Sequence, residues 1–260
     1  MRHSRSIMVW LAVFTCLLYL PLLSIVLAAL SKSRFFVFPV RTYTTQWFGQ
    51  AWESQQAWGS MATSAIVALI VSVIATFIAL LGALAFARYA WHGRNFYQKL
   101  ILIPIFFPQT VLGLALQIWF SWIGIHHSWQ ASIIAHLVWI SPIVTLVIAI
   151  QVYGFDTSME DAARDLGAGR WQVFRDITFP LLGPGIFAGW LFALLLSWGN
   201  FAMSYFTNGA DVSSPEWIYG KLIGGYTPIV PAVGVFTMLI GAVTLIVGLL
   251  INDRLQRSRE

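Results

Sequence analysis

Residues 160–168 read Glu-Asp-Ala-Ala-Arg-Asp-Leu-Gly-Ala, and they belong to a charged segment that ends at Pro180. Five of the ten acidic residues of the chain lie between Asp156 and Asp176, although 58% of the 260 residues are hydrophobic and only 10% are charged. Soluble domains carry about 25% charged residues, so the composition indicates a membrane protein. A membrane protein that keeps one such segment between apolar runs is expected to present it to a soluble partner.

Apolar runs without Asp, Glu, Lys or Arg flank this segment and recur along the chain. A helix of about 20 residues crosses a hydrocarbon core of about 30 Å and satisfies its own backbone hydrogen bonds there. Pro104 and Pro108 are expected to distort the third run. The sequence predicts an all-α integral membrane protein, a single domain over residues 1–260, with six transmembrane helices over residues 7–30, 61–87, 100–124, 131–153, 184–206 and 228–251.

Basic residues are distributed unevenly between the loops. Eleven of the 15 Lys and Arg residues lie in the two terminal segments and in the loops after the second and fourth runs. Cytoplasmic loops carry the excess of Lys and Arg, so both termini and the loop 154–183 are predicted to be cytoplasmic. The basic residues form no stripe, which argues against nucleic-acid binding. The single cysteine, Cys16, excludes an intramolecular disulfide and a cysteine-based zinc cluster.

The loop 154–183 is expected to form two short helices. Thr157-x-x-Glu160 and Ser158-x-x-Asp161 both resemble a capping box at the start of the first helix, the second with Asp in place of the usual Glu. Gly167 is well placed to end that helix in the left-handed conformation. A second helix is expected over residues 169–177. Two interpretations remain open from this pattern: an amphipathic loop that rests on the membrane surface, and a docking element for a soluble protein.

The spacing of this loop resembles the coupling loop of permease subunits of bacterial ATP-binding-cassette (ABC) importers. Their pattern is Glu-Ala-Ala, three residues, Gly, nine residues, Ile, one residue, Leu-Pro. This chain has Asp161-Ala162-Ala163, Gly167, Ile177 and Phe179-Pro180 at the same spacing, with Asp161 in place of Glu and Phe179 in place of Leu. From Arg41 to Ile251 the layout resembles the second permease of spermidine/putrescine-type importers.

The resemblance implies a type I ABC importer permease fold, in the bacterial cytoplasmic (inner) membrane. It implies three partners: a second permease subunit in a different chain, a dimer of cytoplasmic ATP-binding subunits, and an extracytoplasmic substrate-binding protein. The sequence contains no Gly-x-x-x-x-Gly-Lys-Ser/Thr loop, so ATP and Mg are expected on the partner ATPase and no cofactor on this chain. The implied ATPase-coupling residues are Glu160, Asp161, Ala162, Ala163, Gly167, Ala168, Phe174, Ile177 and Pro180.

Polar residues are rare inside the predicted spans, so those present are candidates for a translocation path. Hydrogen bonding between helices is the other reading, and the sequence leaves both open. The stretch 197–200 contains no acidic residue, although an acidic one is common there in the spermidine/putrescine-type permeases that this chain resembles. The implied cargo is a small polar solute such as a polyamine, a phosphonate or an opine. The candidate path residues are Gln109, Gln117, Ser197, Trp198, Asn200 and Ser204.

Other functional classes find less support in the sequence. The apolar runs hold no carboxylate and no paired nucleophile and base, which disfavours an enzyme and a proton-coupled carrier. A secondary transporter or channel subunit not powered by ATP remains the alternative. His136 is expected to bridge helices or to relay a proton, and His126 and His127 lack the further ligands of a metal site. The aromatic residues of segment 31–59 indicate either an interfacial segment or a platform for an external partner.

Overall fold

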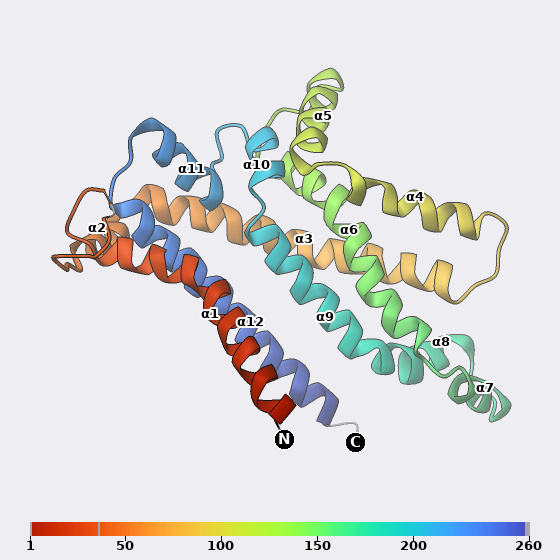
Figure 1. Ribbon diagram of the computed structural model, residues 1–260. Helices are drawn as coiled ribbons and strands as arrows, with labels where there is room; N and C mark the ends of the chain where they lie inside the picture. Colours follow the sequence, from red (N-terminus) through yellow and green to blue (C-terminus); the bar gives the residue numbers. More distant parts are fainter. Residues whose placement is uncertain (1, 36, 258–260) are drawn as a thin grey trace. The chain divides into compact units, whose positions relative to one another are not determined.

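A computed structural model describes residues 2–35 and 37–257 of the 260-residue chain. Within these residues the chain is helical, and its β-structure is limited to one isolated antiparallel bridge between Ser31 and Tyr43. The all-α prediction is confirmed. The elements are α1 (Arg2–Leu30), α2 (Gln46–Glu53), α3 (Gln55–Ala87), α4 (Arg94–Phe106), α5 (Gln109–Trp122), α6 (Trp129–Tyr153), α7 (Ser158–Asp165), α8 (Arg170–Val173), a π-helical segment η1 (Phe174–Thr178), α9 (Phe179–Trp198), α10 (Phe201–Thr207), α11 (Ser214–Gly225) and α12 (Ile229–Arg257) (Figure 1).

Several helices have the length and composition of membrane spans. Among the described residues there are five, or six if the bent pair of α4 and α5 counts as one span. This agrees with a multi-pass membrane protein. The five are Ile7–Leu30, Gln55–Ala87, Trp129–Tyr153, Arg170–Trp198 and Ile229–Arg254.

The predicted third span, residues 100–124, is not one straight helix. α4 and α5 meet at an angle of 101°. Phe107 between them is extended, with φ −80° and ψ 137°, and Pro108 follows it. Proline lacks the N–H that continues a helix, and it forces the preceding residue out of the helical conformation. The expected distortion is therefore present, but as a full break at Phe107–Pro108, while Pro104 lies inside α4.

The predicted fifth span, residues 184–206, differs from the structure at both ends. Helical structure runs without a break from Arg170 through η1 into α9 and stops at Trp198. Asn200 is extended, and its side-chain oxygen accepts a hydrogen bond from the backbone N–H of Met203 at 3.0 Å. Asparagine is a favoured N-cap residue, so Asn200 starts a new helix, α10, where the sequence pattern predicted that the old one continues.

The chain divides into two compact units. One comprises Met1–Gly59 with Trp217–Ile240, and the other Ser60–Glu216 with Gly241–Glu260. The single domain expected over residues 1–260 stays a prediction.

In the first unit, aromatic rings from segment 31–59 pack on α12. The ring centroids of Phe48 and Trp52 lie 5.8 Å and 6.2 Å from that of Phe236. Trp58 lies 5.0 Å from Trp52, edge to face. Aromatic pairs of this geometry stabilise a fold by more than the burial of their apolar surface alone. Part of this aromatic segment therefore packs on α12 and does not face outward, although Trp52 remains 64% exposed.

In the second unit, the core forms where α3, α6 and α9 meet. The buried face of α3 consists largely of small residues at helical spacing, among them Ala75, Ala79 and Ala83, which are fully buried. Small side chains let helix backbones approach closely, and van der Waals packing at such contacts associates helices in membranes.

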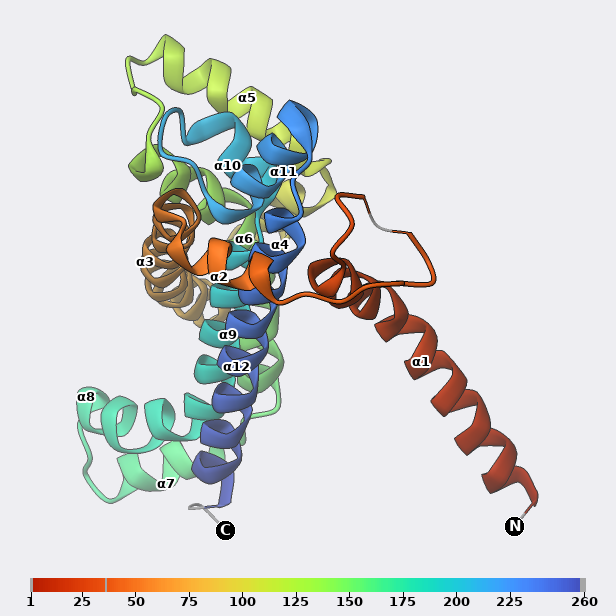
Figure 2. The same cartoon turned by 90° about the vertical axis from the view of Figure 1, so that its left-hand side faces the viewer.

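Two glycines of α9 bring it against α6. A Cβ atom at Gly185 would lie 2.6 Å from Cβ of Gln151, and one at Gly189 would lie 2.9 Å from Cγ1 of Ile148. Both distances are too short for a methyl group, so the two helices touch because these positions lack side chains. The packing fixes the lower half of α9, and beside that end lie α7 and α8, as both views show (Figures 1 and 2).

Replacement of Gly185 by Ala should destabilise the protein by about 1–3 kcal/mol, because the added methyl group overpacks the contact between α6 and α9. The free energy of unfolding of the purified protein in detergent measures the effect. Gly220→Ala on α11 is the matched control, since nothing lies within 4 Å of its Cβ position. If both variants are equally stable, close packing at Gly185 does not support this fold.

Candidate functional site

The first helix of the charged loop, α7, begins differently from the predicted capping box. Asp156 accepts a hydrogen bond from the backbone N–H of Ser158 at 2.9 Å, and Thr157 makes no side-chain cap bond. The Ser158 backbone N–H, assisted by its hydroxyl, holds the pKa of Asp156 below its ordinary value. The capping box Thr157-x-x-Glu160 was wrong because the carboxylate of Glu160 turns into the protein and is not available to its own backbone. The alternative Ser158-x-x-Asp161 was wrong because Ser158 is the first residue of α7 and not its N-cap.

The end of α7 is as expected. Gly167 has φ +90°, in the left-handed region. Its N–H bonds to the carbonyl oxygen of Arg164 at 2.9 Å, and the N–H of Ala168 bonds to that of Ala163 at 3.0 Å. This pair of bonds is a Schellman motif, which satisfies carbonyl groups at a helix end. A Cβ at Gly167 would meet no atom within 4 Å, so the backbone conformation alone calls for glycine there.

The second predicted helix, over residues 169–177, is realised as α8 and η1. It does not end before the membrane span but continues into α9. The N–H of Phe179 bonds to the carbonyl oxygen of Phe174, five residues earlier, which defines the π-helical register. Pro180 follows, and it cannot donate a backbone hydrogen bond. A turn at Gly167 separates α7 from α8, and from α8 the chain is helical through η1 into α9.

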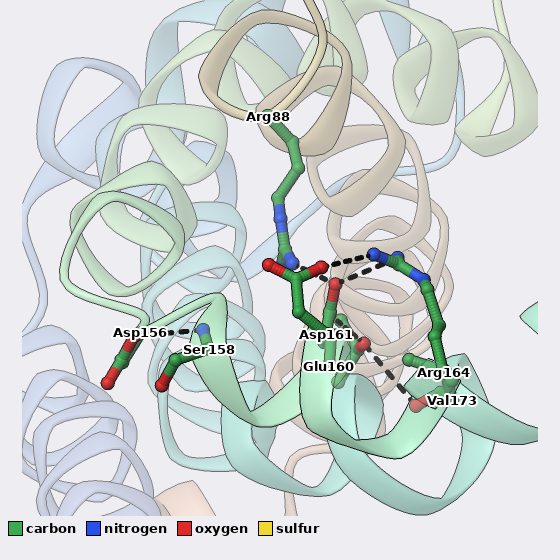
Figure 3. A network of polar contacts seen from close by, with 8 residues as sticks. Arg88, Asp156, Ser158, Glu160, Asp161, Arg164 and Val173 are labelled. Atoms are coloured by element: carbon green, nitrogen blue, oxygen red, sulfur yellow. Dashed lines mark hydrogen bonds and ion pairs between the residues drawn. The ribbon is translucent and has the colours of Figure 1, made fainter. Parts of the chain in front are cut away.

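A buried carboxylate lies at the centre of the loop. The side chain of Glu160 forms an ion pair with Arg88, which follows α3, and accepts a hydrogen bond from the hydroxyl of Thr178 in η1. Arg164 contacts the same carboxylate at 3.3 Å and Asp161 at 2.8 Å. Figure 3 shows Arg88 and Arg164 on either side of Glu160 and Asp161. Sequence reasoning missed Arg88 and Thr178, since neither belongs to the motif and their partner lies far away in the sequence.

The opposite face of the loop is exposed and partly apolar. Leu166 is 90% exposed and Trp171 is 71% exposed. Asp161, Ala162, Gly167 and Pro180 are exposed as well, whereas Ala163, Ala168, Phe174 and Ile177 are half-buried. Of the predicted coupling residues, Glu160 alone is buried. The face available to a partner therefore combines an acidic side chain, small residues and large apolar ones.

A cleft of about 940 Å³ lies between the end of α3 and this loop. Leu84, Arg88 and Tyr89 line it on one side, and Arg164 and Arg170 line it on the other. The ion pair of Arg88 with Glu160 lies at its wall.

Side-chain hydrogen bonds account for three of the candidate path residues: Ser197, Asn200 and Ser204. His136 of α6 contacts the hydroxyl of Ser197 through Nδ1 at 2.8 Å and that of Ser204 through Nε2 at 3.0 Å. Asn200 caps α10. His136 therefore bridges α6 to the end of α9 and to α10, across the break between them. Ser197 and Ser204 lie close together, and interhelical hydrogen bonding accounts for both.

The other candidate path residues are more dispersed. Gln109 and Gln117 are half-buried on α5, away from the hydrogen bonds of His136. Trp198 is half-buried, and its indole ring lies 3.8 Å from the Cβ position of Gly241. A common lining for all six residues stays a prediction.

Replacement of Gly167 by Ala should loosen the end of α7, because a left-handed non-glycine residue costs about 1–2 kcal/mol. Hydrogen exchange of the α7 amides, measured by mass spectrometry, should accelerate about fivefold or more. Gly169→Ala is the control: it adds the same methyl group, also in open space, at φ −71°. Equal exchange in the two variants would contradict the structural role of the Schellman motif.

Replacement of His136 by Ala should lower the free energy of unfolding by about 1–2 kcal/mol, since it removes two interhelical hydrogen bonds worth about 0.6 kcal/mol each and leaves a void. Chemical unfolding in detergent measures the change. His92→Ala, at an exposed position before α4, should leave stability unchanged. An unchanged stability of the His136 variant would rule out the bridge as a support of the fold.

The chain is similar to known proteins. The family model of binding-protein-dependent transport system inner membrane components matches residues 78–258. The spermidine/putrescine transport system permease protein PotC of Escherichia coli (strain K12) is 27% identical over 235 residues, which is 90% of this chain and 89% of that protein. The putrescine transport system permease protein PotI of the same strain is 27% identical over 253 residues, which is 94% of this chain and 89% of that protein.

A solved structure shares the fold. A chain of a bacterial ABC transporter involved in the import of the acidic polysaccharide alginate matches with a TM-score of 0.69 at 19% identity, over 98% of this chain and 95% of that chain. The family match covers the loop, the cleft and the bridged helices described above. The chain belongs to the family of binding-protein-dependent transport system inner membrane components, and it is a multi-pass permease of the ABC-importer type.

Proposed function

We propose that this permease forms half of the translocation pathway for a small polar solute and is driven by a separate ATPase that binds the loop from Thr157 to Pro180. One observation carries the proposal: α7 ends in a fixed Schellman turn that presents Leu166, 90% exposed, next to small residues. The same short loop also exposes Trp171, which is 71% exposed. Several large apolar side chains exposed on one loop outside the spans indicate a contact surface, so a protein partner is expected to cover them.

The proposed partner is a dimer of cytoplasmic ATP-binding subunits, which hold ATP and Mg. A cleft of the ATPase receives α7, and closure of the ATPase pair moves two such helices, one from each permease. The second permease is a different chain, as the resemblance to spermidine/putrescine-type systems suggests. An extracytoplasmic binding protein delivers the cargo on the other side. The excess of Lys and Arg in the loops supports a cytoplasmic position for both termini and for α7.

This chain acts as a transport component without catalysis of its own. Its relatives PotC and PotI are named as transport permeases, which supports this assignment. Membership of the importer family also argues against the alternative of a secondary carrier or channel that works without ATP. The chain is proposed to work in the inner membrane, as the family description and the apolar helices suggest.

For the cargo, two observations pull in different directions. Similarity to PotC and PotI favours a polyamine. However, residues 197–200 contain no carboxylate, and a cationic solute would be attracted by one. Asn200 is the position to examine, because Asp caps a helix as well as Asn does and so would add charge without loss of the cap. We propose a small polar solute, with polyamines as the first class to assay.

Replacement of Leu166 by Glu should reduce the amount of ATPase subunit that copurifies with the permease about tenfold or more. A charged group placed in an apolar contact weakens binding by at least about 1.4 kcal/mol. The measurement is the ratio of the two subunits after purification of the tagged permease from membranes.

Phe96→Glu is the matched control, since Phe96 is also apolar and 70% exposed but lies on α4, outside the loop. It should leave the ratio unchanged. If no ATP-binding subunit copurifies with the unmodified chain, or if Leu166→Glu retains it fully, the proposed coupling through this loop is wrong.

A further inference from the structure

α7 is connected to the spans in unequal ways. The chain runs directly from α6 into α7, and helical structure runs from α8 through η1 into α9. A displacement of α7 therefore reaches α6 and α9 through the backbone. α3 ends at Ala87, far from α7 in the sequence, and only non-covalent contacts join them.

The most direct of these contacts is polar. Arg88 follows the last residue of α3 and forms an ion pair with Glu160 of α7. Thr178 of η1 donates a hydrogen bond to the other oxygen of the same carboxylate. One buried carboxylate thus links α3, α7 and η1, and Figure 3 shows Arg88 reaching from α3 to Glu160. Glu160 precedes Asp161, the residue at the acidic position of the motif.

The surroundings hold this contact in one arrangement. The side chains of Arg88 and Glu160 are only 13% and 6% exposed. The guanidinium group of Arg88 also lies 4.5 Å from the ring centroid of Phe155, which packs on one side of it. The cleft of about 940 Å³ occupies the space between the end of α3 and the loop beside the pair. The ion pair therefore lies at the wall of a space that apolar side chains do not fill.

A buried ion pair of this kind has a strong preference for its bonded geometry. Each charge has been removed from water, so separation of the two leaves a buried charge without its partner. Charge-assisted hydrogen bonds also fix direction as well as distance. The end of α3 and the start of α7 are therefore expected to move together rather than to slide past one another.

We infer that Arg88 and Glu160 are a positioning pair that makes the end of α3 follow α7, so that the displacement of α7 by the ATPase reaches a third span in addition to α6 and α9. The inference rests on the proposed function, because it concerns how movement that begins at the docked loop is distributed among the spans.

The test measures one distance in two states of the full transporter, with both permeases and the ATPase dimer in lipid nanodiscs. Spin labels are attached to cysteines that replace His92, beyond α3, and Asp165, at the end of α7, both of which are exposed. Cys16 is replaced by Ser. Pulsed electron paramagnetic resonance measures the distance between the two labels, once without nucleotide and once with ATP and vanadate.

With the native pair, the distance distribution should be the same in both states. The double variant Arg88→Met with Glu160→Gln removes both charges and leaves neither one buried alone. In it the distribution should shift between the two states, because α3 no longer follows α7. The single variant Arg88→Lys keeps the charge pair with Glu160, so its distance distribution should be the same in both states, as in the native protein. Arg175→Met, which removes an exposed arginine 3.5 Å from Asp176 in the same loop, should have no effect.

An unshifted distribution in the double variant would overturn the inference, and so would a shift with the native pair. Loss of the ATPase from the double variant but not from Arg175→Met would also overturn it, because the pair would then serve docking. Failure of the proposed function looks different: the ATPase would not be retained even by the unmodified chain.

Discussion

The hydrocarbon core of a membrane offers no hydrogen-bond partner, and this constraint governs where polar groups lie in the permease. Three buried threonine hydroxyl groups bond to the helix that carries them: Thr76, Thr145 and Thr207 each donate to the carbonyl oxygen four residues earlier, at 2.7 Å. His136 is satisfied by two serines instead, and in this way it joins three helices. His136, Ser197 and Ser204 are thus explained first as structure, and contact of these three with cargo has to arise when their bonds rearrange.

The same constraint leaves the charges to the loops, where one of them is nevertheless buried. Glu160 is the buried carboxylate among the described residues, and it is tolerated because Arg88, Arg164 and Thr178 surround it. This gives α7 two faces with different roles. The inner face is held by the ion pair, and the outer side exposes Asp161 and the following Leu166, where we propose that the ATPase binds. A docking element needs both, since a helix that is loosely held would absorb movement instead of passing it on.

Local patterns were the part of the structure that the sequence predicted well. The apolar runs gave the helices, Gly167 gave the end of α7, and the spacing from Asp161 to Pro180 led to the family that the comparisons then showed. Contacts between distant residues were beyond reach. The partner of Glu160 is 72 positions away at Arg88, and nothing near either residue marks the pair. The capping box Thr157-x-x-Glu160 failed for that reason, because a local motif competed with a distant partner and lost.

The helix breaks could be foreseen in place but not in extent. Pro108 pointed to a distortion, but nothing local to it indicates the angle of 101° or the packing of α5 against α10. Asn200 looked like a polar residue in a span, and its role as an N-cap became visible only once Gly199 ended α9. In both cases the signal was present in the sequence, and tertiary packing decided how it was used.

Whether α7 of this permease docks into an ATP-binding subunit can be measured in intact membranes. A photo-crosslinking amino acid is placed at position 166, and mass spectrometry identifies the crosslinked product. Docking of α7 gives a product that contains an ATP-binding subunit, with none when the crosslinker replaces Phe96. A product that contains only lipid, or only another span of a permease, would contradict it.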